Sequence, residues 1–200
     1  MERYYAERLA QFGPTPRGAD WSSAESQLLR FDRLLAAIAE ADDSDTSLVD
    51  YGCGYGALLD VLRSRGRRLR YHGFDISGTM IDAARTRHGG DEGATFTTEL
   101  SAVPRSHYTL ASGIFNVRLG HGVQEWHEYV METLAAIDAL STRAFAFNML
   151  STYSDPDRRR EDLFYADPLS MFDACKRQFS ARVALLHDYP LYEFTLIVRK

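Results

Sequence analysis

Three glycines at alternate positions stand out in the segment LVDYGCGYGALLDVL, residues 48–62: Gly52, Gly54 and Gly56. An acid, Asp50, lies two residues before the first of them. The apolar residues before the glycines predict a buried strand, and those after them predict a helix. A turn at the carboxyl end of such a strand is where open α/β sheets bind ligands, and glycine lets the backbone approach a ligand closely. The spacing therefore predicts a ligand-binding loop rather than a bare turn.

Two ligands compete for this loop. Gly52, Gly54 and Ala57 satisfy the G-x-G-x-x-G/A pattern of dinucleotide sites, and Asp75 follows about 20 residues later, where that pattern has a ribose-binding acid. The pattern alone therefore leaves NAD open. Asp50 favours S-adenosylmethionine, because a carboxylate here would repel a pyrophosphate and attract an amino-acid ammonium. A charge-assisted contact of that kind contributes roughly 1.5–3 kcal/mol.

The elements that must position this loop alternate along the chain. Prolines and glycines at 13–20 predict a loop. A helix is predicted to follow, because Ser22 and Glu25 have capping-box spacing. Its apolar face begins with Ala24, Leu28 and Phe31 and continues to Ile38. Strands are predicted at 48–52, 70–76, 94–100, 108–114, 143–150, 183–189 and 192–200, and helices at 58–62, 79–88, 124–140 and 169–179.

This alternation predicts an α/β fold with a mostly parallel, doubly wound, seven-stranded sheet covered by helices on both faces. Pro190 and Leu191 alone separate the last two strands, which is too short for a parallel crossover, so these strands form an antiparallel C-terminal hairpin. The short link between the third and fourth strands predicts a reduced helix there. We expect one structural domain, with an N-terminal helical lid segment at 1–45 and the sheet domain at 46–200.

Composition narrows the class of protein. The 200 residues are 45% hydrophobic and 26% charged, which is typical of a soluble domain. A net charge of −5 disfavours a general nucleic-acid binder. Cys53 and Cys175 have neither metal-ligand spacing nor a disulfide pattern, so we expect no metal and a reducing, cytoplasmic compartment. A charged N-terminus and the lack of a long apolar run predict neither a signal peptide nor a membrane span.

The motifs resemble those of class I S-adenosylmethionine-dependent methyltransferases, whose fold is Rossmann-like, over roughly residues 46–200. LVDYGCGYG is similar to the first motif of that family, FDISGTMIDAAR to the second and ASGIFN to the fourth, while ATFTTEL places Glu99 where an acid often lies near the adenine. The resemblance implies S-adenosylmethionine as cofactor. It implies these cofactor-binding residues: Asp50, Tyr51, Gly52, Cys53, Gly54, Gly56, Asp75, Ile76, Met80, Glu99, Leu100, Ser112 and Gly113.

The reaction implied is in-line transfer of a methyl group from a sulfonium to a nucleophile. Alignment of the two reactants contributes up to about 7–11 kcal/mol. A general base is needed only where the nucleophile is protonated, as a phenol or an alcohol is. His121, which follows the fourth predicted strand, and His187, at the end of the sixth, are the candidates, although a loop or turn histidine without a catalytic role is the competing interpretation.

Aromatic and basic residues outside the motifs could contact the acceptor or only pack. The segment before the first strand could close over the site, and the loop after the fifth strand could line a pocket or bind an anion. The acceptor-side candidates are Tyr4, Tyr5, Trp21, Asn116, Met149, Tyr153, Arg158 and Tyr165. We expect methyl transfer to an oxygen atom of a small molecule, with a protein or RNA acceptor and a non-catalytic S-adenosylmethionine-binding module as alternatives. The oligomeric state is left open.

Overall fold

The computed structural model describes residues 1–39 and 43–200; residues 40–42, within the predicted N-terminal segment 1–45, lie outside the described residues. The strands are β1 (Ser47–Tyr51), β2 (Arg70–Phe74), β3 (Ala94–Thr97), β4 (Ser106–Ala111), β5 (Ser141–Leu150), β6 (Arg182–Leu186) and β7 (Glu193–Arg199). The α-helices are α1 (Glu2–Phe12), α2 (Ala24–Leu35), α3 (Ala57–Ser64), α4 (Gly78–His88), α5 (Val123–Leu140) and α6 (Pro168–Gln178). Short 3-10 turns are η1 (Pro16–Ala19), η2 (Leu100–Ala102) and η3 (Pro156–Arg158).

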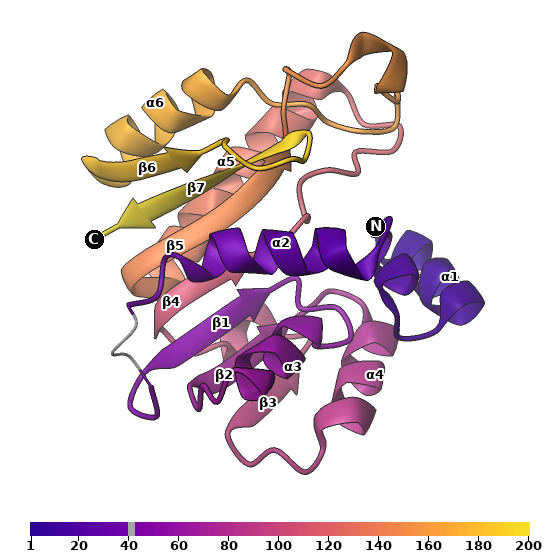
Figure 1. The fold of residues 1–200 in the computed structure, drawn as a ribbon, viewed down its shortest axis with the longest axis vertical. Helices are drawn as coiled ribbons and strands as arrows, with labels where there is room; N and C mark the ends of the chain where they lie inside the picture. Colours follow the sequence, from indigo (N-terminus) through magenta and orange to yellow (C-terminus); the bar gives the residue numbers. More distant parts are fainter. Residues whose placement is uncertain (40–42) are drawn as a thin grey trace.

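The strands of the described residues form one sheet in the order β3-β2-β1-β4-β5-β7-β6 (Figure 1). The pairings among β1 to β5 are parallel, whereas β7 inserts antiparallel between β5 and β6. The predicted fold class is thereby confirmed: a Rossmann-like, mostly parallel, seven-stranded sheet with a C-terminal antiparallel hairpin. The strand order reverses between β1 and β4, which is the switch point where ligands bind in such sheets.

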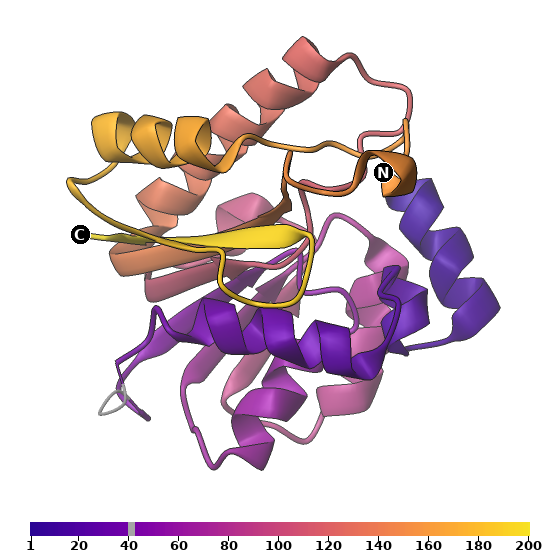
Figure 2. The same cartoon turned by 45° about the horizontal axis from the view of Figure 1, so that its top comes forward.

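Helices cover the two faces of the sheet in separate layers (Figure 2). Helices α2 and α3 bury one set of side chains with Leu48, Tyr71 and Leu110, while α5 and α6 bury a second set with Phe145 and Phe147. Between β3 and β4 the chain has only η2, as the short link predicted. The predicted strand 94–100 accordingly ends at Thr97, and its last residues form this turn.

The start of α2 differs from the sequence prediction. Its N-cap is Ser23, whose hydroxyl accepts from the Ser26 N–H at 3.1 Å, while the Ser23 N–H donates back to the Ser26 hydroxyl at 3.3 Å. The predicted pairing of Ser22 with Glu25 is therefore wrong by one residue. A serine at both ends of the box satisfies the same free backbone donors as the more usual acid.

The buried face of α2 is also rotated from the predicted one. Leu28 is 43% exposed and Ile38 lies beyond the end of the helix. The residues that α2 buries are Gln27, Arg30, Phe31 and Leu34. Two polar side chains replace apolar ones on the buried face because they border a cavity instead of the core.

Candidate active site

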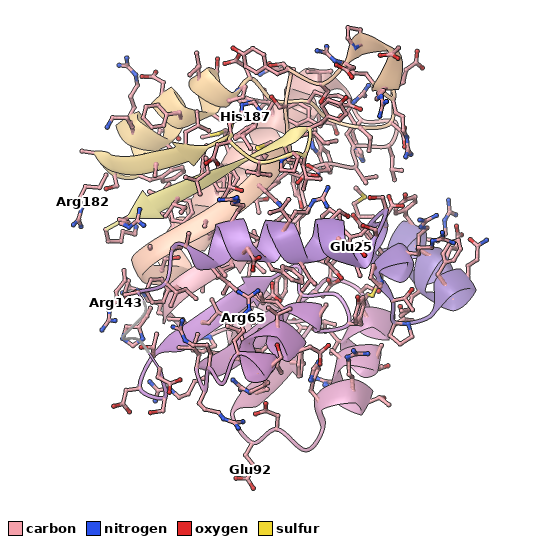
Figure 3. All side chains as sticks on the ribbon, in the orientation of Figure 1. Glu25, Arg65, Glu92, Arg143, Arg182 and His187 are labelled. Atoms are coloured by element: carbon pink, nitrogen blue, oxygen red, sulfur yellow. The ribbon has the colours of Figure 1, made fainter. Side chains whose placement is uncertain are left out.

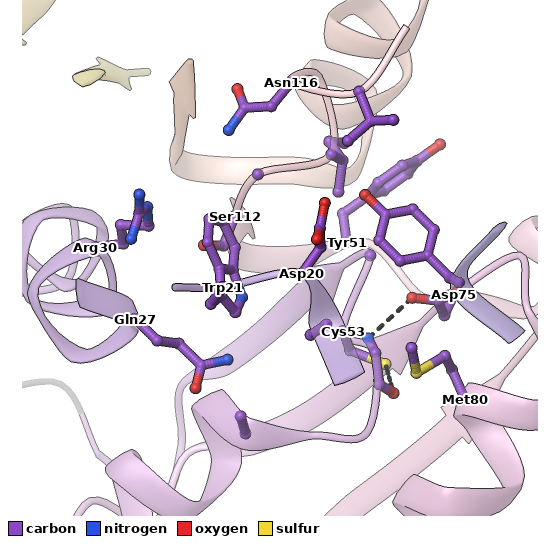
Figure 4. Close-up of a pocket in the computed structure, with 18 of the residues that line it drawn as sticks. Asp20, Trp21, Gln27, Arg30, Tyr51, Cys53, Asp75, Met80, Ser112 and Asn116 are labelled. Carbon is purple, nitrogen blue, oxygen red and sulfur yellow. Dashed lines mark hydrogen bonds between the residues drawn. The ribbon is translucent and has the colours of Figure 1, made fainter. Parts of the chain in front are cut away.

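A cavity of about 290 Å³ lies at the carboxyl ends of β1, β2 and β4. Its wall combines the glycine loop, the start of α2, the segment after β4 and the first residue of β7 (Figure 4). The N-terminal segment also contributes to this wall, through Met1, Tyr5 and residues 19–22. The cavity thus occupies the position where the sheet topology predicts a ligand site.

The glycine loop has a backbone that only glycine adopts readily. Gly52, Gly54 and Gly56 have φ values of 82°, 54° and 83°, in the left-handed region. A Cβ on Gly52 would lie 2.2 Å from Cγ2 of Ile114. The Gly52 N–H donates to the Phe74 carbonyl at 2.7 Å, which fixes the loop to the end of β2. The loop is therefore held by its neighbours in a form that side chains would disrupt.

Asp75, directly after β2, holds the glycine loop against the start of α4. Its carboxylate accepts the Gly54 N–H and the Ser77 N–H, both at 2.9 Å, and the first of these bonds is drawn in Figure 4. Burial raises the pKa of Asp75, although these two backbone donors act in the opposite direction. Each carboxylate oxygen keeps a further lone pair for a ligand.

Asp50, at the penultimate position of β1, is 3% exposed and borders the same cavity. The Tyr71 hydroxyl donates a hydrogen bond to its carboxylate. Burial raises the pKa of Asp50 to about 7, although the hydrogen bond from Tyr71 acts to lower it. A cation placed beside this carboxyl group would favour the ionised form. The side chain therefore suits a positively charged ligand group.

The opposite wall is organised around a buried ion pair. Arg30 donates from Nε and Nη2 to the two carboxylate oxygens of Glu193, at 2.8 and 2.6 Å, and from Nη1 to the Ser26 carbonyl at 2.8 Å. The guanidinium lies over the Trp21 ring, 4.3 Å from its centroid. A Cβ on Gly113 would lie 2.2 Å from the Trp21 ring, so this glycine admits the indole.

Two further ion pairs support the wall. Asp20 pairs with Arg8 at 2.6 Å and accepts the Tyr4 hydroxyl at 2.6 Å. Arg160, from the segment between β5 and α6, donates from Nε to Asp162 at 3.0 Å and also pairs with it through Nη2. Both pairs place one partner in the cavity wall and the other outside it.

Neutral polar groups complete the site. The Asn116 Oδ1 accepts the Leu150 N–H at 3.1 Å, and the Asn148 Oδ1 accepts the Gly113 N–H at 2.7 Å. Among the described residues, the buried hydroxyl of Ser112 has no hydrogen-bond partner within the protein. An unpartnered buried hydroxyl at a cavity wall is costly unless a ligand or water bonds to it.

Most of the residues predicted around the cofactor do border the cavity. The predicted residues in its wall are Tyr5, Trp21, Asp50, Tyr51, Gly52, Cys53, Gly54, Asp75, Ile76, Met80, Ser112, Gly113 and Asn116. Gly56 lies behind the wall, at the N-cap of α3, where its carbonyl lies 3.0 Å from the His88 Nε2. A Cβ there would lie 2.8 Å from the His88 ring.

Glu99, predicted near the adenine, and Leu100, also predicted to bind the cofactor, are not among the residues of the cavity wall. β3 ends at Thr97, and the chain then turns through η2, where both side chains are exposed. The reduced connection between β3 and β4 is the physical reason for this correction.

The two histidines predicted as general bases also lie outside the wall. His121 precedes α5, where its ring contacts Glu125 at 3.0 Å and packs against Trp126. His187 follows β6, the edge strand, and lies between the rings of Tyr153 and Phe194. In Figure 3 it lies above α2, whereas α3 and the labelled Arg65 lie below. Neither imidazole faces the cavity, and no histidine borders it among the described residues.

Five acceptor-side predictions fall outside the wall for separate reasons. Tyr4 lies behind Asp20, and Met149 is fully buried beneath α5 and α6. Tyr153 is 66% exposed, and Arg158 is exposed on η3 beside Asp155. The remaining residue is Tyr165, whose hydroxyl accepts the Arg160 N–H at 3.0 Å.

The sequence analysis missed the polar residues of the opposite wall. Gln27 and Arg30 share a helix face with Phe31 and Leu34, so a polar stripe within an apolar face was the available signal. Glu193 begins a strand that is buried as far as Val198, and its own side chain is 1% exposed. A charge at the head of a buried strand indicates a partner, but the sequence does not identify which arginine it is.

The fold and the glycine-loop site define a class of Rossmann-like proteins with a cofactor at the switch point. Residues 23–143 match the family model for a methyltransferase domain, so the chain belongs to that family. It is 50% identical, over 154 residues, to the Mycobacterium tuberculosis protein Rv1506c, which is named provisionally as a methyltransferase. That match covers 77% of this chain and 93% of the relative.

Solved structures extend the comparison at the level of the fold. Magnesium protoporphyrin IX methyltransferase of Synechocystis PCC 6803, with bound S-adenosylmethionine, superposes with a TM-score of 0.63 at 15% identity, covering 88% of this chain and 79% of that one. The DhpI complex with S-adenosylhomocysteine gives 0.61 at 12% identity, covering 98% and 92%. With the family match, these findings make the chain an S-adenosylmethionine-dependent methyltransferase.

The site itself fits this cofactor. The glycine loop leaves its backbone open, since a Cβ on Gly54 would meet nothing nearer than the Met80 sulfur at 3.9 Å. Asp50 suits a cationic group, and the Asp75 carboxylate keeps lone pairs for hydroxyl groups. These features match a ligand with an ammonium group and hydroxyl groups, as S-adenosylmethionine has.

Proposed function

We propose that the acceptor is a small molecule methylated on oxygen. The observation that carries the proposal of a small acceptor is the wall on the acceptor side of the cavity, where Trp21 packs over Gly113 and Met1 and Tyr5 also border the cavity. A cavity whose wall includes the chain's own N-terminal segment suits a molecule that enters whole, not a macromolecular surface. We also propose that, of the predicted lid segment 1–45, the part before α2 acts as the lid of this cavity, because α2 itself packs into the core beside the sheet.

We assign the cofactor contacts as follows. Asp50 receives the ammonium of the methionine moiety, the backbone of Gly52 to Gly54 lies along that moiety, and Asp75 accepts from the ribose hydroxyls. Ile76 and Met80 border the same end of the cavity. When bound, S-adenosylmethionine supplies a methyl group already activated on a sulfonium. The protein must orient the acceptor toward that methyl group and exclude water.

Nucleic acid and membrane surfaces are not part of this proposal. Arg160 pairs with Asp162 and Arg158 with Asp155, which leaves the loop after β5 without a uniform positive charge. The basic run at 63–70 is similarly compensated, since Arg63 pairs with Asp91. No helix in the described part of the chain has the length and apolarity needed to cross a bilayer.

Transfer of labelled methyl groups to a cell extract tests the proposal. We expect the label from S-adenosylmethionine to enter the dialysable fraction, with a ¹³C chemical shift typical of a methyl group on oxygen. Asp75→Ala, which removes a proposed cofactor contact, serves as the control reaction. Label confined to protein or RNA, or a methyl group on nitrogen or carbon, would contradict the proposal.

A further inference from the structure

We propose that the acceptor is an uncharged molecule that carries at least one hydroxyl group at the point of transfer. This inference rests on the proposed function and names the class of its acceptor. It follows from the charges, hydrogen-bond capacity and apolar surface of the acceptor side of the cavity. We define that side as the wall formed by Asp20, Trp21, Arg30, Ser112, Asn116, Leu150, Arg160, Leu163 and Glu193.

Charge balance is the first argument. Each charged side chain on the acceptor side already has an oppositely charged partner within hydrogen-bond distance, so these side chains together carry no net charge to attract an ion. An ionic acceptor would lose its hydration there without gaining a free counter-charge. The three pairs are Arg8–Asp20, Arg30–Glu193 and Arg160–Asp162.

Hydrogen-bond capacity is the second argument. The hydrogen bonds of Arg30 use three of its five N–H donors, and each Glu193 oxygen, which accepts once from Arg30, has a further lone pair. The Asn116 amide nitrogen adds donors, and the Ser112 hydroxyl can either donate or accept a hydrogen bond. Donors and acceptors therefore lie along one wall. A hydroxyl group, which both donates and accepts, is the ligand group that this mixture suits.

Apolar surface is the third argument. Trp21, Leu150 and Leu163 border the same side, so the carbon framework of the acceptor can be covered while its hydroxyl groups are bonded. In Figure 4, Arg30 and Gln27 lie on the opposite side of the view from Asp75 and Met80, with Trp21 between them. The acceptor side is thus separate from the end assigned to the ribose.

Transfer to such a hydroxyl balances without a further reactant. The acceptor oxygen forms a bond to the methyl carbon, and the carbon–sulfur bond breaks with its electron pair remaining on sulfur. The hydroxyl proton is released to solvent water, so the Arg30–Glu193 and Arg8–Asp20 pairs stay intact. The products are a methyl ether and an uncharged thioether, S-adenosylhomocysteine.

Matched probes test the charge of the acceptor. The full-length protein is given labelled S-adenosylmethionine with two probe sets: a methyl pyranoside with its uronic acid and its amino sugar, and a catechol with its carboxylate and its aminomethyl derivative. In at least one set, we expect the neutral probe to receive about tenfold more alkali-stable label than the charged probes, because moving a charge out of water is disfavoured. In the extract experiment, the labelled product should pass both anion and cation exchangers at neutral pH.

A charge-balance variant provides the internal control. Asp162→Asn leaves Arg160 in the wall without its carboxylate, while Asp162 itself lies outside the wall, and its side chain is partly exposed. We expect the preference for the neutral probe over the acidic one to fall by about fivefold to tenfold. The double variant Arg160→Gln with Asp162→Asn restores neutrality and should restore the preference. Affinity for S-adenosylhomocysteine should stay within about twofold in both.

Three outcomes overturn the inference: preferential labelling of an acidic or basic probe, labelling of no neutral probe, and a labelled extract product that either exchanger retains. An unchanged preference in Asp162→Asn also counts against it. Each of these can occur while label still enters a small molecule, so the inference would fall and the proposed function would stand. Label found only on macromolecules would instead remove the proposed function.

Discussion

The two sides of the cavity are built from very different lengths of chain. The cofactor side comes from one stretch, Asp50 to Met80, which forms a strand, a loop, a helix, a strand and the start of a helix. The acceptor side joins Trp21 and Arg30 to Glu193, on the last strand. The first side depends on local backbone conformation. The second depends on contacts between residues far apart in the sequence, and each of these residues contributes to the site only together with its partner.

The two sides also treat charge differently. Asp50 and Asp75 receive hydrogen bonds from a tyrosine and from backbone N–H groups, with no cation among their described hydrogen-bond partners. On the acceptor side each carboxylate has an arginine. The cofactor side is therefore prepared for a cation, and the acceptor side is internally neutral. Variants that remove a carboxylate from the cofactor side should therefore have different effects from variants that break an ion pair on the acceptor side.

The largest expected effect is on stability. Glu193→Ala leaves the Arg30 guanidinium buried without its carboxylate, which should lower the free energy of unfolding by about 3–5 kcal/mol. Urea denaturation measures this. Asp173→Ala is the matched control, since it breaks the exposed Arg177–Asp173 pair and should cost at most about 1 kcal/mol. Equal stability of the two variants would show that the buried pair does not organise the acceptor side.

Asp75→Ala should act mainly on cofactor binding. It removes the acceptor of the Gly54 and Ser77 N–H groups as well as the proposed ribose contact. We expect affinity for S-adenosylhomocysteine to fall by more than about tenfold, given roughly 1.5–3 kcal/mol for a charge-assisted bond. Calorimetry measures this, with Asp91→Ala as a control, because Asp91 also accepts a backbone N–H but lies away from the cavity. Normal binding by Asp75→Ala would remove the ribose assignment.

The pH dependence of cofactor binding should follow Asp50. With its pKa at about 7, only about a tenth of the side chain is ionised at pH 6, so affinity should rise about tenfold between pH 6 and pH 8. Asp50→Asn should flatten this profile. In the free protein the raised pKa means that the folded state binds the proton more tightly than the unfolded state does. That contribution to stability is therefore full at low pH and is lost as pH rises through about 7.

Trp21→Ala should give the smallest effect on the cofactor side. Loss of the indole over Gly113 should loosen the N-terminal segment and speed tryptic cleavage after Arg17, while affinity for S-adenosylhomocysteine changes by less than about threefold. Quantitative proteolysis and calorimetry on the same samples measure the two responses. Should affinity fall as far as in Asp75→Ala, the two sides would not be separable, and Trp21 would belong to the cofactor contacts.

The two sides of the cavity also differ in how much of their structure could be predicted from the sequence. The sheet, the hairpin and the glycine loop were predictable because alternating apolar segments and φ-permissive glycines are local signals. The general-base predictions, His121 and His187, rested on their position after strands, which does not determine where a side chain points. Arg30 and Glu193 were missed because pairing across 163 positions leaves no local pattern. Glu99 was misplaced because the length of β3 depends on the reduced link that follows it.

The position of β7 between β5 and β6 has a consequence for how the enzyme is made. The cofactor motifs are synthesised long before Glu193, and the strand that carries Glu193 must then pair with both β5 and β6, which precede it in the chain. Until that insertion, Arg30 has no carboxylate to meet, and the acceptor pocket does not exist. A nascent chain can therefore acquire the residues that hold the methyl donor before it acquires the pocket that receives the methyl group.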